Sequence, residues 1–334
     1  MNIIYKDTKI HHLSGNTYYF SLGWATIPFY VADRTHAIML DTGLSSSAPI
    51  ILRGMEREGL KVSAIIHSHM HNDHICGDLL VYQEYKPEIY GSETDLLDAV
   101  HTFEHRPPDS DKNEEEIIEI RRTLSLIEHR FHPFEKYAEP NSFMGAVHDP
   151  ELPYTQTLNV LGKAFLLIDD PGHCLDHKMI VTPDGVCYLA DSIMYGQRLD
   201  HSKIPYVYDL GDSIRVRRRL GALPFPEFIA AHSGVFSRDE LEEVERKNLE
   251  LSRIVFRHIA AIRAAEPNLS LKRSMDALYD RMSIHNYRDT SWLNDTVRQY
   301  IEYYDSHPDW EQQLQPVRPV WPVWPAWPRF RMPG

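Results

Sequence analysis

The spacing of apolar and polar residues changes along the chain, and each change predicts a structural unit. From residue 1 to about 43, short β-branched and aromatic runs such as TYYFSLG and IPFYVAD alternate with Gly, Asn and Asp, which predicts paired strands separated by turns. Residues 48–60 carry apolar positions at helical spacing, and KVSAII at 61–66 returns to a strand pattern. Strand, helix and strand in this order indicate the start of an α/β layer.

The middle of the chain has a helical segment between two strand-rich regions. Within about 91–154, the stretches 93–104 and 114–137 have helical periodicity on either side of the polar break RPPDSDKN. The runs TLNVLG, AFLLIDD, HKMIVTP, VCYLADS and FPEFIAA then have the composition of strands. We therefore predict one α/β domain over residues 1–237, with a helical insert at about 91–154.

The last hundred residues divide into two parts. Residues 238–305 carry apolar positions at mostly helical spacing, which predicts a helical C-terminal region. Residues 306–334 form a Pro/Trp-rich tail in which Trp321, Trp324 and Trp327 recur every third residue. A polyproline II helix would align these rings along one edge for docking. We favour the alternative, a disordered or artificially added tail without a role of its own.

Composition and charge narrow the class of protein. Of 334 residues, 43% are hydrophobic, which suits a globular fold, and the formal net charge of -13 disfavours nucleic acid as a partner. The three cysteines show no CxxC spacing, so neither a disulfide framework nor a cysteine zinc cluster is expected. The N-terminus lacks the features of a signal peptide, and no apolar run approaches membrane-spanning length. We expect a cytoplasmic protein without membrane association.

A dense group of metal-ligand residues follows the strand at 61–66. The sequence HSHMHNDHICGD places His69, His71, Asp73 and His74 within six residues. Imidazole nitrogens and carboxylate oxygens are the ligands of divalent metals such as zinc in catalytic sites. At a strand end, His69 and His71 point the same way and can bind one ion, whereas Asp73 and His74, at the turn into the next helix, face a neighbouring ion.

Two ions need further ligands, and the later chain offers three at strand ends. They are His173 in DDPGHCLDH, Asp191 in YLADS and His232 in IAAHSG. A carboxylate has two oxygens, so Asp191 is the natural bridge between the ions.

These motifs, in the order HxHxDH, PGH, a strand-end Asp and a final His, resemble the metallo-β-lactamase superfamily over about residues 1–235. The resemblance implies an αββα sandwich, here with a helical insert and a helical C-terminal region, whose site lies at one edge between two sheets. It implies two divalent metal ions, foremost zinc, with iron or manganese as alternatives. It assigns His69, His71 and His173 to metal one, and Asp73, His74 and His232 to metal two, with Asp191 shared.

The resemblance also implies a reaction. A hydroxide that bridges the two ions would attack an ester, thioester or lactone of small size. Asp73 would orient that hydroxide and later pass a proton to the leaving group. Asp41, in the upstream MLDTG, would fix the orientation of a ligand, and Tyr195 would donate a hydrogen bond to the developing oxyanion.

Three residues close to the ligands are expected to stay outside the metal coordination. His67 alternates with His69 and His71, but the ligand set is complete without it, so we expect a hydrogen-bonded buried histidine. His177, four residues beyond His173, is likewise left out. Cys174 points to the side opposite His173 on an extended segment, so we expect an inert buried thiol.

Alternatives remain at this stage. An endoribonuclease or phosphodiesterase shares the fold, although the acidic charge disfavours it. A mononuclear iron persulfide dioxygenase would leave the second metal site empty, so metal stoichiometry distinguishes it. Hydrolysis of β-lactams is disfavoured without an export signal, and a non-enzymatic binding role would not need Asp73. A homo-oligomer is compatible with the sequence.

Overall fold

Residues 10–104, 114–134, 155–193, 204, 206–283 and 291–317 are described by the computed structural model of the chain. Two β-sheets face each other within it, and the first has seven strands. Their spatial order is β1 (Ile10–Ser14), β2 (Thr17–Ser21), β3 (Thr26–Val31), β4 (His36–Leu40), β5 (Lys61–Ile66), β6 (Glu88–Gly91) and β7 (Phe131–Pro133). Strands β1 to β4 pair antiparallel, whereas β4 to β7 pair parallel.

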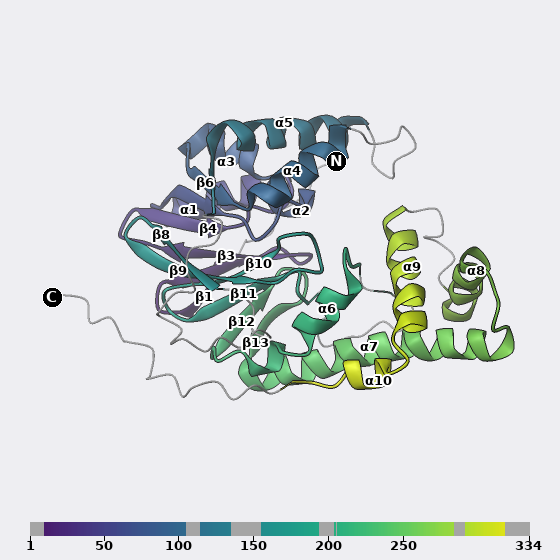
Figure 1. Cartoon of the computed structure of the whole chain (residues 1–334). Coiled ribbons are helices and arrows are strands. Elements are labelled where there is room, and N and C mark those ends of the chain that lie inside the picture. The colour runs from purple at the N-terminus through teal and green to yellow at the C-terminus, as the bar shows by residue number, and fades with distance from the viewer. Residues whose placement is uncertain are drawn as a thin grey trace.

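Parallel pairing requires a crossover between successive strands, and helices supply each crossover. Helix α1 (Ala48–Arg57) joins β4 to β5, and α2 (Asn72–Ile75) and α3 (Asp78–Tyr85) join β5 to β6. Helices α4 (Glu93–Glu104) and α5 (Glu114–Arg130) lie between β6 and β7. Figure 1 shows α1, α3, α4 and α5 together on the outer face of the first sheet.

The second sheet has six strands. Their order is β13 (Gly234–Ser237), β12 (Glu227–Ala230), β11 (Val186–Ala190), β10 (Lys178–Val181), β9 (Lys163–Asp169) and β8 (Thr155–Val160). Only the β11–β12 pair of this sheet is parallel. Its crossover contains α6 (Leu210–Arg217) and the 3₁₀-helix Leu220–Ala222.

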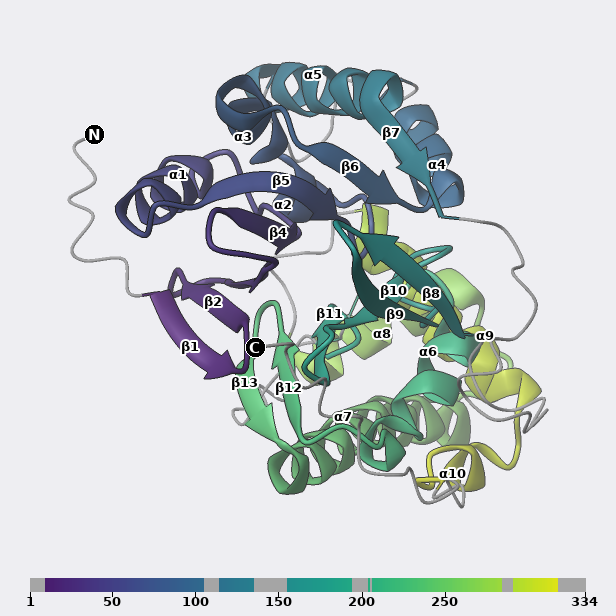
Figure 2. The same cartoon turned by 90° about the vertical axis from the view of Figure 1, so that its left-hand side faces the viewer.

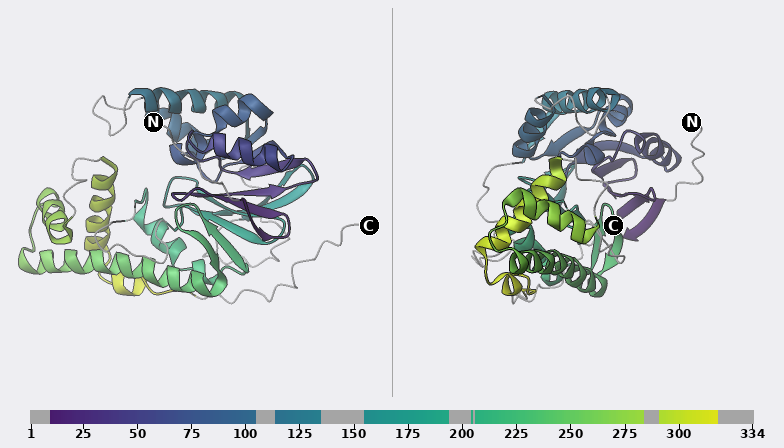
Figure 3. Two further views of the ribbon diagram at one scale, coloured as in Figure 1. Left: turned by 180° about the vertical axis from the view of Figure 1, so that it is seen from behind. Right: turned by 90° about the vertical axis from the view of Figure 1, so that its right-hand side faces the viewer.

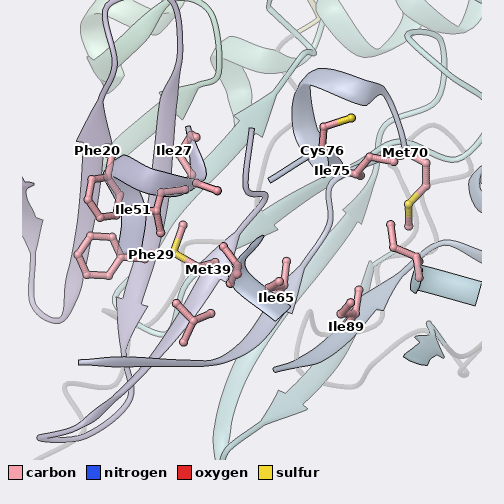
Figure 4. Close-up of a cluster of buried hydrophobic side chains, with 14 of the residues drawn as sticks. Phe20, Ile27, Phe29, Met39, Ile51, Ile65, Met70, Ile75, Cys76 and Ile89 are labelled. Atoms are coloured by element: carbon pink, nitrogen blue, oxygen red, sulfur yellow. The ribbon is translucent and has the colours of Figure 1, made fainter. Parts of the chain in front are cut away.

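Alternation along the strands of the first sheet divides its apolar residues between two cores. On β4, Ile38 and Leu40 join the core between the sheets, whereas Met39 joins the core under the helices. Figure 4 shows Met39 and Ile65 in this second core together with Phe20, Phe29 and Ile51. Because neighbouring side chains of a strand point to opposite faces, one apolar run can fill both cores.

The C-terminal region packs on the outer face of the second sheet and extends past it. Helix α7 (Arg238–Ala265) contacts β12 and β13. It begins at a capping box, in which the Ser237 backbone N–H donates to the Glu240 carboxylate over 2.8 Å. Helices α8 (Leu271–Met282) and α9 (Ser291–Ser306) stand on the far part of α7, and α10 (Trp310–Gln313) follows them (Figures 2 and 3).

This arrangement is a helix layer, two sheets and a second helix layer, which confirms the predicted αββα sandwich with a helical C-terminal region. The predicted helix 114–137 is too long: it ends at Arg130, and residues 131–133 form β7. The predicted insert thus contributes an edge strand, which a run of three residues is too short to indicate by its periodicity. In the part of the chain that the structure describes, no helix is long and apolar enough to cross a membrane.

The Pro/Trp-rich segment does not begin where the sequence suggested. Trp310 and Leu314 are buried against α7 and α9 in the core of the C-terminal helices, so residues up to 317 belong to that region. Trp321, Trp324 and Trp327 lie outside the described residues.

We expect the core between the sheets to dominate the stability of the sandwich. Leu167 on β9 is fully buried there, and Leu167→Ala should lower the free energy of unfolding by about 2–5 kcal/mol, because it leaves a cavity. Leu161→Ala is the matched control, since Leu161 is 45% exposed at the β8–β9 turn, and it should change stability by less than about 0.5 kcal/mol. Urea unfolding of both variants measures the difference, and equal losses would contradict the assignment of the core.

Candidate metal centre

The histidine-rich motif follows β5 at the edge between the two sheets. The chain leaves β5 at Ile66 and enters the short helix α2 after His71, whose backbone is extended. His69 and His74 are buried, while His71 and Asp73 are partly exposed. The end of the strand therefore directs its ligand side chains into the molecule, with an opening to solvent.

Three imidazole rings converge at one position. His71 Nδ1 lies 3.0 Å from His69 Nε2 and 2.9 Å from His173 Nε2. His173 comes from the loop after β9, which the facing sheet supplies. Three nitrogens within 4.8 Å of one another are a suitable donor set for a divalent cation.

A second group lies beside the first. His232 Nε2 lies 3.2 Å from Asp73 Oδ2 and 3.4 Å from Asp191 Oδ1, and His74 Nε2 is also 3.4 Å from that Asp191 oxygen. The other Asp191 oxygen, Oδ2, lies 3.3 Å from His173 Nε2 in the first group. One carboxylate thus faces both groups.

Buried atoms without partners test whether metal ions fit these groups. His74 Nε2 and Asp191 Oδ1 are buried, and neither makes a hydrogen bond with the described residues. Leaving such atoms unpaired is costly, and a cation between them would satisfy both. The donor set of histidines and aspartates therefore fits two divalent ions.

The charge state of the first group also suits a metal. Burial, together with the neighbouring histidines His74 and His71, holds the pKa of His69 well below its ordinary value. Burial likewise lowers the pKa of His173, although Asp191 opposes the shift. Both rings are therefore neutral at physiological pH, and a neutral ring keeps the lone pair that a metal needs.

Asp41 supports this centre from behind. It follows β4 in a left-handed backbone conformation, φ +62°, and its carboxylate is almost completely buried. It accepts hydrogen bonds from the Ser68 backbone N–H (2.9 Å), the Ser68 hydroxyl (2.7 Å), His74 Nδ1 (2.8 Å) and the Tyr188 hydroxyl (2.8 Å). Burial alone would raise the pKa of Asp41, but the charge of His74 and the hydrogen bonds from His67 and His74 outweigh it, and the pKa is lowered. A fixed His74 Nδ1 aims the other ring nitrogen at the second group.

His67 lies behind the ligands, between two acids. Its Nδ1 is 3.2 Å from Asp41 Oδ1 and its Nε2 is 2.9 Å from Asp78 Oδ2. Burial opposes a charge on the ring, but Asp78 and Asp41 raise the pKa of His67 to about 9. The Thr42 hydroxyl donates to Asp78 over 2.6 Å and completes the network.

His177 positions Asp191 by a hydrogen bond to the backbone of that residue. Its Nε2 accepts the Asp191 backbone N–H at 3.3 Å, and its Nδ1 lies 2.8 Å from Asp170 Oδ2. The Ser192 hydroxyl donates to the same Asp170 carboxylate. His177 therefore positions Asp191 and lies outside both ligand groups.

The loop that carries His173 is anchored by α4. The Cys174 thiol donates to Asp95 Oδ2 over 3.0 Å, and the Asp176 backbone N–H donates to Asp95 Oδ1 over 2.9 Å. Burial and the Asp95 carboxylate raise the pKa of Cys174 well above its ordinary value, so the thiol stays protonated. The insert thus contributes to the geometry of the centre.

The described geometry can be compared with known proteins. A family model described as the metallo-beta-lactamase superfamily matches residues 27–232. The chain belongs to the metallo-β-lactamase superfamily. None of the curated proteins matches the chain significantly.

Solved structures of this superfamily share the fold. A metallo-beta-lactamase family protein from Thermus thermophilus aligns with a TM-score of 0.54 and 16% identity, over 85% of this chain and 89% of that chain. A metallo-beta-lactamase from Hirschia baltica aligns with a TM-score of 0.48 and 11% identity, over 72% of this chain and 97% of that chain. At 16% identity, the likeness to the Thermus thermophilus protein is one of fold.

The structure of this metallo-β-lactamase superfamily member brings the seven predicted ligands into two adjacent groups. They are His69, His71, His173, Asp73, His74, Asp191 and His232. Tyr195 lies outside the described residues. Sequence reasoning did not single out the supporting side chains Tyr188, Asp78, Asp170 and Asp95. The first three lie within the motifs YLADS, HSHMHNDHICGD and DDPGHCLDH, so the signal was present there, whereas Asp95 on α4 belongs to no such motif.

We expect Asp41→Asn to weaken metal binding about 10- to 100-fold without removing a ligand, because the buried carboxylate that orients His74 is lost. Competition with a chromophoric chelator measures the affinity. Tyr188→Phe is the milder comparison, since it removes one of the hydrogen bonds to Asp41 and keeps the carboxylate. An Asp41→Asn protein that folds and binds metal with unchanged affinity would contradict the role of Asp41.

Proposed function

We propose that the protein is a binuclear metal-dependent hydrolase of a small ester, thioester or lactone. The observation that carries the proposal is the pair of ligand groups joined by Asp191, whose two oxygens lie 3.3 Å from His173 Nε2 and 3.4 Å from His74 Nε2 and His232 Nε2. Superfamily members are mostly metallo-hydrolases, which supports an enzyme. We further propose that residues 1–237 form the catalytic domain.

His69, His71 and His173 would hold one ion, and Asp73, His74 and His232 the other, with Asp191 shared. Two divalent ions, which we propose to be zinc, would supply hydroxide at neutral pH and polarise a substrate carbonyl. Fixed imidazoles and buried carboxylates keep the centre preorganised, so little reorganisation is needed during the reaction.

Asp73 is the residue of the second group best placed to move a proton. Its side chain is 31% exposed, compared with 3% for Asp191 and 2% for His74. One Asp73 oxygen lies near His232, and the side chain stands at the open side of the site, where a water and a leaving group can reach it. We propose that Asp73 orients the attacking water and carries a proton to the leaving group. The oxyanion role of Tyr195 stays a prediction.

The complete second group favours hydrolysis over persulfide oxidation, because a mononuclear iron enzyme would not need His74, His232 and Asp73 arranged around another ion. Metal analysis therefore distinguishes the two reactions, and a substrate panel distinguishes acyl hydrolysis from cleavage of phosphodiesters.

We expect zinc-loaded protein to hydrolyse at least one of a panel of thioesters, lactones and esters, with about two metals per chain. Asp73→Asn should lower kcat by about 100-fold or more, because proton transfer by a positioned carboxylate is lost. Asp276→Asn, which changes an exposed carboxylate on α8, is the matched control and should leave kcat unchanged.

Other outcomes would redirect the assignment. Activity confined to RNA or phosphodiesters would indicate a nuclease or phosphodiesterase. A single bound iron without hydrolysis would indicate the dioxygenase. Full activity in Asp73→Asn would exclude the proposed role of Asp73.

A further inference from the structure

A short segment, residues 206–210, leads into α6 and lies between the metal centre and the C-terminal helices. Val207 and Leu210 are buried in the core formed by α7, α8 and α9. Tyr206 alternates with Val207, and its ring lies 5.4 Å from the His173 ring and 5.9 Å from the His71 ring, between centroids. The segment therefore inserts one side into the C-terminal core and places Tyr206 against two metal-site histidines.

Hydrogen bonds attach this segment on both sides. The Tyr208 and Asp209 backbone N–H groups donate to the Gly172 carbonyl over 2.8 and 3.1 Å, immediately before His173. On the other side, Gln299 of α9 donates through Nε2 to the Tyr208 carbonyl (2.7 Å) and accepts the Leu210 N–H at Oε1 (2.8 Å). The side-chain hydroxyl of Thr296, also on α9, lies 3.3 Å from both the Val207 N–H and its carbonyl.

Gly172 allows the backbone of the His173 loop to lie close to the segment 206–210 and to α6. Its backbone has φ +123°, which L side chains rarely adopt, and a Cβ there would lie 2.4 Å from the Ser213 backbone nitrogen at the start of α6. The loop of His173 and the segment of Tyr206 can therefore pack backbone against backbone.

The surface of this wall is aromatic. Tyr206 is half-buried and Tyr208 is 43% exposed, while Val207 between them is buried in the C-terminal core. An apolar chain placed beside His71 and His173 would therefore meet an aromatic ring.

We propose that Tyr206 forms the substrate-binding wall beside His71 and His173, that this wall takes an apolar acyl chain, and that Thr296 and Gln299 hold it in place. The proposal rests on the hydrolase function above and names its substrate class. Tyr206 is then a specificity-determining residue, and Thr296 and Gln299 are positioning residues that act through the segment 206–210.

Alkyl hydroxamates test the wall without catalysis. The zinc-loaded full-length protein is titrated calorimetrically with acetohydroxamic acid and octanohydroxamic acid. We expect the octanoyl compound to bind about tenfold more tightly than the acetyl compound, because its methylenes are buried against Tyr206.

Variants separate the roles of the residues. Tyr206→Ala should abolish the gain in affinity that the longer chain gives, and it should leave the affinity for acetohydroxamate unchanged. Tyr206→Phe should keep this gain in affinity. Gln299→Ala should reduce this gain in affinity about threefold at unchanged zinc content, because the segment 206–210 loses two hydrogen bonds to α9. Asp276→Asn, which changes an exposed position on α8, should leave this gain in affinity unchanged.

The outcomes distinguish the two proposals. If octanohydroxamate binds no more tightly than acetohydroxamate, or if Tyr206→Ala keeps the gain, the wall is excluded even when esters are hydrolysed. If the chain-length pattern follows Tyr206 but no acyl substrate is hydrolysed, the wall stands and the hydrolase assignment fails. Absence of any hydroxamate binding would overturn both.

Discussion

The buried carboxylate of Asp41 is the interaction on which the metal centre depends. It stands at the end of β4 and joins three parts of the chain: the turn after β5 through Ser68, the helix α2 through His74, and the second sheet through the Tyr188 hydroxyl. Tyr188 lies 147 residues away in sequence. A buried anion is stable only with several donors, so these parts must meet for the fold to tolerate Asp41. Its left-handed backbone is a strained conformation of the kind found at functional sites.

A second constraint is the position of Asp191 between the two ligand groups. The residue follows Ala190, which also has positive φ, and its backbone N–H is held by His177. His177 is in turn oriented by Asp170, so a chain of buried polar groups fixes the carboxylate from behind while its oxygens face the ligands. Asp41 and Asp191 thus follow strands of opposite sheets and meet at the edge between them, which is why the sandwich needs both sheets to build the centre.

The candidate metal ligands were easier to predict from the sequence than the side chains that position them. HxHxDH is local and dense, and each later ligand follows an apolar strand, so position and residue type were both visible. The helix predicted at 93–104 matches α4. By contrast, Asp95 and Cys174 are 79 residues apart, and neither periodicity nor spacing indicates that a thiol will donate to that acid. The strand β7 was missed because three residues after a long helix carry no alternation that could be recognised.

The C-terminal helices show how a region without ligands can belong to a metal site. Their core includes Val207 and Leu210, which lie on the segment that follows Tyr206 and leads into α6. Burying these two aliphatic residues orders the segment, and the amide of Gln299 satisfies backbone groups on both sides of Asp209. The free energy that folds the helical region therefore also positions Tyr206 against His173. Loops on a rigid scaffold commonly carry specificity, and here the rigidity of one such loop comes from helices outside the sandwich.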